Sequence, residues 1–244
     1  MKLFLQIMGL LFLTACIIIP PKPEGFIEKE IQTSNFSIAV WEKENIQPEQ
    51  TLRIYIEGDG DPIPSHLIAL DFAKRDTNPN VIYIARPCQW TKDAVCKQKP
   101  NIYGQDRFHE EIMREMQELI YYLIKKYHAP DIELIGYDGG AVVALNMAAK
   151  SPTKRVITIA GITSLSAYNF YHNLPNVENA EDPEDNSFVL AQIPQIHYVG
   201  AQDEVTPRKL AEHFVAHLKR PKSAVVKVVP DVNHVNWQGV RLDY

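Results

Sequence analysis

One aspartate stands where an apolar strand, a sharp turn and a helix follow each other in the sequence. Residues 132–135 form the apolar run, Gly136-Tyr137-Asp138-Gly139-Gly140 the turn, and small residues continue from there in a helical pattern. A turn of this kind presents its central side chain as a nucleophile, and its glycines allow the helix to pack close to the strand. The pattern therefore makes Asp138 the candidate nucleophile of an enzyme.

Two more residues with catalytic chemistry follow later apolar runs. Asp203 comes after residues 196–199, and His234 after residues 225–229. A histidine oriented by a carboxylate can act as a general base, and the chain order nucleophile, acid, histidine is the one such sites use. We expect Asp138, Asp203 and His234 to lie together as a triad.

Apolar runs with strand character alternate with amphipathic runs along the chain. This alternation predicts an α/β fold in which a mostly parallel sheet is covered by helices on both faces, with the ligand site at the carboxyl ends of the strands. Strands are expected at residues 36–41, 52–56, 81–85, 132–135, 156–159, 196–199 and 225–229, and helices at about 65–75, 106–127, 140–150 and 207–219.

Five short motifs resemble the α/β-hydrolase superfamily, and more narrowly its small exported bacterial members. The resemblance covers nearly all of the mature chain and implies an α/β-hydrolase fold without a full cap domain. It also implies that Asp203 is the acid, that His234 is the base, and that N–H groups near Asp59, Gly60 and Gly139 form an oxyanion hole. The motifs are Gly58-Asp59-Gly60, Arg86-Pro87-Cys88, Gly136-Tyr137-Asp138-Gly139-Gly140, Gly200-Ala201-Gln202-Asp203 and Asn233-His234.

The sequence departs from this superfamily at position 138, where Asp replaces the expected Ser. A carboxylate that attacks an ester would form an anhydride and expel a more basic alkoxide, so direct ester hydrolysis is disfavoured. Attack on a saturated carbon or a strained epoxide suits a carboxylate, as in haloalkane dehalogenases and epoxide hydrolases. Here only about 35 residues separate the strand at 156–159 from the next one, enough for a lid. Tyr171 in that stretch is either an oxygen donor or a packing residue.

We therefore expect a hydrolase acting on a small or lipidic substrate. The alternative is an inactive hydrolase relic that binds a ligand or partner, because two aspartates beside one histidine would hold it as imidazolium. A further reading has Asp138 or His234 activating water directly on a labile ester.

Several of these residues also have simpler explanations. The glycine loop at residues 57–61 could be an ordinary turn or a weak cation loop, and Asp203 or Thr206 could cap the helix that follows. His213 and His217 have the spacing of metal ligands on a helix, but they share it with lysines, so a solvated face is expected. The acidic stretch 176–187 is expected to be a solvated loop. No cofactor or metal is implied.

The N-terminal residues read as a bacterial lipoprotein signal. A charged start and an apolar run lead to Leu13-Thr14-Ala15-Cys16, which resembles a lipobox. We expect a signal peptide at 1–15, a lipidated Cys16 with a tether over 16–30, and the hydrolase domain over 31–244. Ile17 favours the outer membrane, facing the periplasm. A membrane-spanning anchor is the alternative, but its apolar run is short.

Export also bears on the two remaining cysteines. Cys88 and Cys96 lie eight residues apart in a polar loop, where an oxidising compartment favours a disulfide over a metal pair. The chain carries 30 acidic and 25 basic residues with no basic run, which argues against nucleic-acid binding. A monomer bound to the membrane through its lipid, with a small-molecule or lipid-like substrate, is the expected form.

Overall fold

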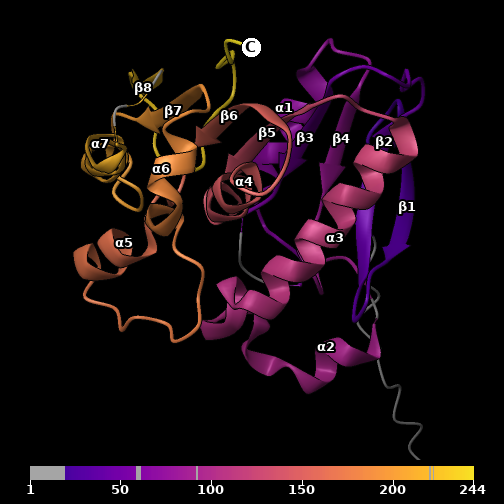
Figure 1. Ribbon diagram of the computed structural model, residues 1–244, viewed down its shortest axis with the longest axis horizontal. Helices are drawn as coiled ribbons and strands as arrows, with labels where there is room; N and C mark the ends of the chain where they lie inside the picture. Colours follow the sequence, from indigo (N-terminus) through magenta and orange to yellow (C-terminus); the bar gives the residue numbers. More distant parts are fainter. Residues whose placement is uncertain (1–19, 59–61, 92, 220, 222) are drawn as a thin grey trace, which may run out of the picture.

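The sheet that carries the predicted site has eight strands and is mostly parallel (Figure 1). The computed structural model describes residues 20–58, 62–91, 93–219, 221 and 223–244. The strand order is β1-β2-β4-β3-β5-β6-β7-β8; β1 and β2 pair antiparallel with each other and with β4, and the remaining neighbours are parallel. The strands are β1 Phe26–Gln32, β2 Ser37–Lys43, β3 Leu52–Ile56, β4 Val81–Ile84, β5 Ile132–Tyr137, β6 Thr153–Ile159, β7 Gln195–Gly200 and β8 Ala224–Val229.

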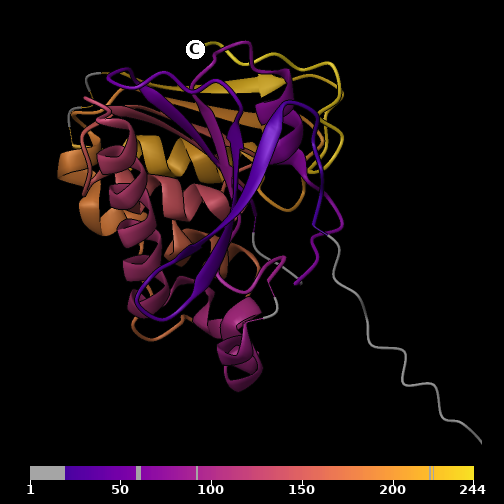
Figure 2. The ribbon, with the colours of Figure 1, turned by 90° about the vertical axis from the view of Figure 1, so that its right-hand side faces the viewer.

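Helices cover both faces of this sheet, as the alternation of strands and helices predicts. Side chains alternate along the strands: Ile54 faces one apolar cluster with α3, α4 and α7, while Tyr55 faces a second with α1 and the C-terminal segment. Figure 2 shows α3 and α4 together on one side of the strands. The helices are α1 Ile68–Arg75, α2 Ala94–Gln98, α3 Glu110–Tyr127, α4 Gly140–Ala148, α5 Leu165–Tyr171, α6 Ser187–Leu190 and α7 Arg208–His217, with 3-10 turns η1 Pro100–Tyr103, η2 Gln105–Phe108 and η3 Pro183–Asn186.

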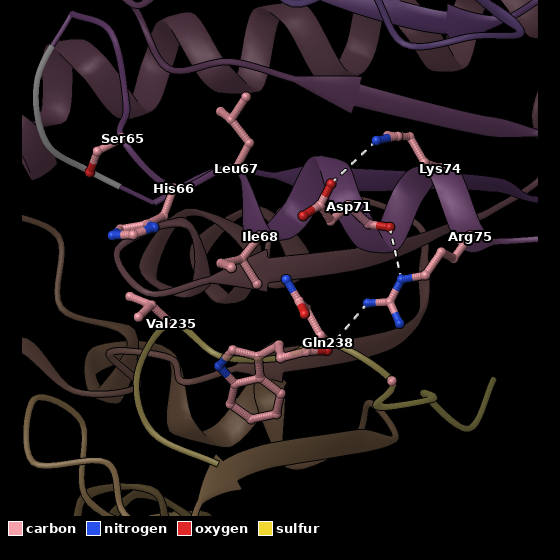
Figure 3. Close-up of a pocket in the computed structure, with 11 residues that line it drawn as sticks. Ser65, His66, Leu67, Ile68, Asp71, Lys74, Arg75, Val235 and Gln238 are labelled. Carbon is pink, nitrogen blue, oxygen red and sulfur yellow. Dashed lines mark hydrogen bonds and ion pairs between the residues drawn. The ribbon is translucent and has the colours of Figure 1, made fainter.

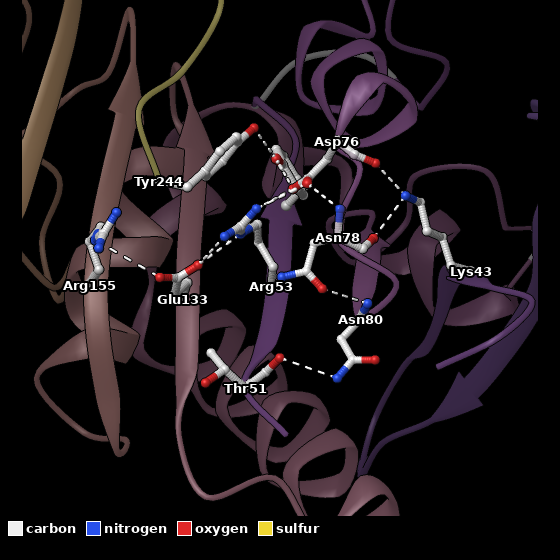
Figure 4. Close-up of polar contacts among 10 residues, drawn as sticks. Lys43, Thr51, Arg53, Asp76, Asn78, Asn80, Glu133, Arg155 and Tyr244 are labelled. Carbon is white, nitrogen blue, oxygen red and sulfur yellow. Dashed lines mark hydrogen bonds and ion pairs between the residues drawn. The ribbon is translucent and has the colours of Figure 1, made fainter. Parts of the chain in front are cut away.

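A buried charge network joins the amino-terminal ends of the central strands (Figure 4). Arg53 of β3 donates to Glu133 of β5 at 2.8 Å and to both carboxylate oxygens of Asp76, at 2.8 and 3.0 Å. The Tyr244 ring lies 3.8 Å from the guanidinium, and its hydroxyl is 2.6 Å from that of Tyr55. These charges are buried but paired, so they satisfy one another at the end of the sheet away from the predicted site.

The structure extends the predicted element list at several places. All seven predicted strands and four predicted helices are present, but β1 begins at Phe26, within the stretch 16–30 expected to be a tether. Between β6 and β7 the chain forms the short elements α5, η3 and α6, which make no separate cap domain. No helix in the described part of the chain is long and apolar enough to cross a membrane. Cys16 and the predicted signal peptide at residues 1–15 lie outside the described residues.

Candidate active site

The turn between β5 and α4 has the backbone of a nucleophile elbow. Asp138 has a φ of 49°, in the left-handed region that Asp tolerates better than most residues. Its N–H donates to the carbonyl of Ile159 at 3.1 Å, which ties the elbow to the end of β6. A Cβ at Gly136 would lie 2.4 Å from the carbonyl oxygen of Gly140, and one at Gly140 the same distance from that of Ile56. Only glycine fits at both positions, and this agrees with the prediction that these glycines let the helix pack close to the strand.

The three predicted triad residues come together at the carboxyl end of the sheet. Nε2 of His234 lies 3.5 Å from Oδ1 of Asp138, and its Nδ1 lies 3.0 Å from Oδ2 of Asp203. The side chain of Asp203 is fully buried, while those of Asp138 and His234 keep 16% and 17% of their surface exposed. Asp138 and His234 can therefore be reached from solvent, and Asp203 is shielded behind the imidazole.

Asp203 holds its own loop and the histidine at once. Its Oδ1 accepts the N–H groups of Val205 and Thr206, both at 2.9 Å, and its Oδ2 accepts the Thr206 hydroxyl at 2.8 Å. Burial opposes its ionisation, but the hydrogen bonds from His234 and Thr206 hold the pKa of Asp203 below its ordinary value. Thr206 thus supports the acid; neither residue caps α7, whose N-cap is Pro207.

His234 is placed between two carboxylates, and this decides its charge. Burial disfavours the protonated ring, but the hydrogen bonds and charges of Asp138 and Asp203 outweigh it and raise the pKa of His234 to about 9. Tyr137 and Trp237 fix the loop, since both donate to the His234 carbonyl, at 3.2 and 2.9 Å. The ring is an imidazolium at neutral pH in the resting state.

Gly58, the second residue of the glycine loop at residues 57–61, lies next to the elbow. A Cβ at Gly58 would lie 3.1 Å from Oδ2 of Asp138, so the backbone of Gly58 passes close to this carboxylate. Asp59 and Gly60 lie outside the described residues. Gly139 follows Asp138 directly, as the N-cap of α4, where a helix begins with its N–H groups facing outward.

Directly after β3 lies a buried carboxyl, Glu57, that sequence reasoning did not single out. Glu57 is buried, and it accepts hydrogen bonds from the N–H groups of Gly58 and Ala69, at 3.2 and 3.4 Å, and from the Tyr83 hydroxyl at 3.1 Å. Burial raises the pKa of Glu57 to about 7, against the opposing effect of these hydrogen bonds. Glu57 directly follows the predicted strand at residues 52–56, and this position could have marked it as a candidate site residue.

A disulfide joins Cys88 and Cys96, as predicted, and two residues of the chain between them hydrogen-bond to Gly58 and Pro62. Nε2 of Gln89 donates to the carbonyl of Gly58 at 3.2 Å, and the N–H of Trp90 donates to that of Pro62 at 3.0 Å. Gln89 and Trp90 thus connect the disulfide to the backbone near Asp138. The spacing of the two cysteines did not predict these contacts.

Beside the triad lies a cavity of about 450 Å³ between the start of α1 and the loop after His234 (Figure 3). None of the three triad residues lines it. Its walls combine apolar and charged side chains, among them Leu67, Val235, Trp237, Asp71 and Arg75. The cavity can hold a small molecule next to the histidine loop without contact to Asp138.

Comparison with solved structures shows the α/β-hydrolase fold. An esterase from Pyrococcus furiosus superposes with a TM-score of 0.63 at 14% identity, covering 91% of this chain and 88% of its own. Est1E from Butyrivibrio proteoclasticus has a TM-score of 0.61 at 15% identity, with 86% and 90% covered. An α/β serine hydrolase homologue from Coxiella burnetii has 0.56 at 15%, with 87% and 90% covered. No protein-family model matches the chain, and no curated protein sequence does.

Proposed function

We propose that this protein is a hydrolase that acts on a small or lipidic substrate through Asp138, His234 and Asp203. The observation that carries the proposal is the geometry of the elbow: a carboxylate on a strained turn, 3.5 Å from a histidine whose other nitrogen binds a buried aspartate at 3.0 Å. The neighbouring structures include esterases, which supports hydrolysis as the general chemistry.

The first step is displacement at a saturated carbon. An oxygen of Asp138 attacks the carbon, a C–O bond forms, and the bond to the leaving group breaks with its electron pair. In an epoxide the leaving group is the ring oxygen, which takes a proton from water. The product is an alkyl ester of Asp138, which has no negative charge.

Loss of that charge prepares the second step. His234 then faces one carboxylate instead of two, so its pKa falls and it can release its proton. The neutral imidazole takes a proton from water, the hydroxide adds to the ester carbonyl, and collapse expels the alcohol as the proton passes to it. The carboxylic acid of Asp138 passes its proton to His234, which restores the carboxylate and the resting imidazolium, so the net release to solvent is the one proton that His234 gave up at the start of this step. Gly139 and the glycine loop would bind the carbonyl oxygen.

Trapping the ester tests this proposal. In His234→Gln the first step survives and the second fails, so incubation with a short alkyl halide or a terminal epoxide should add the alkyl mass to the peptide containing Asp138, measured by mass spectrometry. Asp138→Asn should show no adduct. If the adduct forms equally on Asp138→Asn, the nucleophile is elsewhere and the proposal fails.

The resting ion cluster favours a second candidate, an inactive relic that binds a ligand in the cavity beside the triad. A protonated His234 between two carboxylates is a stable arrangement, and it is not a base. The adduct experiment separates the two candidates, because a relic predicts no adduct on His234→Gln with any alkylating substrate. Hydrolysis of short p-nitrophenyl esters only by Asp138→Ser is expected of both candidates, and it would show that His234 and Asp203 can still serve a serine at this position.

We also propose that the protein is tethered to the bacterial envelope, in the outer membrane, by a lipidated Cys16. The lipobox-like sequence before this residue supports the assignment. Membrane fractionation of the wild type beside Cys16→Ala tests it: the variant should leave the membrane fraction, and unchanged fractionation would refute the anchor.

A further inference from the structure

A group of three metal-binding side chain types lies outside the candidate active site. Glu184 of η3 and two histidines of α7, His213 and His217, each offer one ligand atom within 4.8 Å of the others. The histidines are four residues apart, so they share one face of the helix. The acidic stretch and the histidine pair, which the sequence suggested were separate solvated surfaces, are therefore one cluster.

Two of these atoms are already spaced as metal ligands. Nε2 of His213 lies 3.2 Å from Oε1 of Glu184. Zinc lies about 2.0–2.2 Å from nitrogen and oxygen ligands, which places neighbouring ligands of a tetrahedron about 3.3 Å apart. The Glu184 oxygen is buried, and no atom of the described residues meets it with hydrogen-bond geometry. The pair is thus close without forming a proper hydrogen bond.

The second histidine is oriented by its own helix. Nδ1 of His217 lies 2.8 Å from the carbonyl oxygen of His213. A carbonyl only accepts, so Nδ1 carries the hydrogen and Nε2 of the neutral ring keeps its lone pair. A ligating histidine usually donates its other N–H to a carbonyl or carboxylate in this way. The two rings lie 4.0 Å apart between centroids, an arrangement that two imidazolium charges would oppose.

The segment that carries Glu184 is held in place before any metal arrives. Asp182 accepts the N–H groups of Leu165 and Ser166, at 3.0 and 2.8 Å, and that of Glu184 itself at 3.2 Å. On the other side, Asn186 donates to Asn146 of α4 at 3.1 Å. A carboxylate on a segment anchored at both ends costs little to order on binding.

A lysine on the same helix does not compete for this position. Nζ of Lys209, four residues before His213, lies 3.9 Å from the centroid of the Tyr171 ring, so its charge is directed to α5.

We propose that Glu184, His213 and His217 form a binding site for Zn²⁺, with water at the fourth position. Two imidazoles and one carboxylate suit zinc better than Mg²⁺ or Ca²⁺, which prefer oxygen ligands. Bound zinc would join η3, in the connection between β6 and β7, to α7. The site stands apart from the triad and does not depend on the chemistry of Asp138. It departs from the expectation that the chain binds no metal.

Zinc binding to purified protein without a histidine tag tests the proposal. Calorimetric titration should show one Zn²⁺ per chain, with no binding of Mg²⁺ or Ca²⁺, and zinc should raise the melting temperature. His217→Gln and Glu184→Gln should each weaken zinc binding at least about tenfold, because changes to outer-shell groups alone cost about 10–100-fold. Both should also lose the zinc-dependent rise in melting temperature.

His128→Asn is the matched control. His128 is an exposed histidine that ends α3 with a φ of 49°, a conformation that Asn tolerates, and Figure 1 draws α4 between α3 and α7. This variant should bind zinc like the wild type. Melting temperatures without zinc show whether each variant folds. The proposal is overturned if zinc does not bind, if His217→Gln and Glu184→Gln bind it as well as His128→Asn, or if His234→Ala alone abolishes binding.

Discussion

Replacing Asp138 by Asn removes one of the two carboxylates that face His234 while it keeps the size of the side chain. The pKa of His234 is about 9, against an ordinary value near 6.5, and this difference corresponds to about 3 kcal/mol. One carboxylate at this distance typically accounts for about 1–3 in pKa. We therefore expect the pKa of His234 in Asp138→Asn to fall to between about 6 and 8. Asn is uncharged, like the alkyl ester of Asp138. The pKa of His234 in Asp138→Asn therefore approximates its pKa in the ester intermediate, from which the second step starts.

Titration of the His234 ring by NMR measures this directly, and stability gives an independent check. The folded state holds the His234 proton more tightly than the unfolded chain, so its contribution is fully present below pH 6.5 and is lost as pH rises towards 9. For the wild type, the free energy of unfolding from urea titrations should therefore fall by up to about 3 kcal/mol across that window. In Asp138→Asn the fall should be smaller and end at a lower pH.

Asp231→Asn controls for the change of one charge in this region. Asp231 is exposed, lies three residues before His234, and has a φ of 58°, which Asn accepts. It should leave the pKa of His234 near 9. A His234 that still titrates near 9 in Asp138→Asn would show that Asp138 does not hold its proton, and the argument for a charge-triggered second step would be lost.

Three further comparisons test the scaffold, with stability measured by urea denaturation. Arg53→Met removes the arginine that the buried carboxylates of Asp76 and Glu133 share and should cost about 3–5 kcal/mol, whereas Arg155→Met, which removes a longer and more exposed contact to Glu133 at 3.9 Å, should cost less than about 1 kcal/mol. Thiol titration of the unfolded, unreduced protein should find Cys88–Cys96 blocked, and their double replacement by Ser should cost about 2.5 kcal/mol, from the entropy of the short loop. Gly140→Ala meets backbone at 2.4 Å and should cost about 3 kcal/mol or more; Gly104→Ala, with its nearest contact at 3.6 Å, should be close to neutral, and equal losses would contradict the packing argument.

The fold was predictable because its strands are buried on both faces and read as continuous apolar runs. β5, with six buried residues, and α3, with apolar residues at helical spacing, carry this signal clearly. β1 lacks this signal. Most of its side chains are exposed, because β1 lies at the edge of the sheet and is paired with β2 alone among the described strands. Short elements such as α5 and α6 carry too few turns for a periodic pattern.

The proximity of Asp138, Asp203 and His234 was predictable because each of them follows a strand, and parallel strands end at the same edge of a sheet. The supporting residues follow no such rule. Gln89 reaches Gly58, and Thr206 reaches Asp203, through side-chain contacts that depend on loop conformation. The link between Glu184 and His213 joins residues far apart in the sequence, so neither stretch alone indicates the other.

Glu57, the buried carboxyl directly after β3, is present in both charge states near neutral pH. Its pKa is about 7, so some molecules carry it protonated and the others carry it ionised. The two populations differ by a single charge next to Gly58, whose backbone lies close to Asp138. A rate or affinity measured at pH 7 is therefore an average over two species, and Glu57→Gln reduces the sample to one.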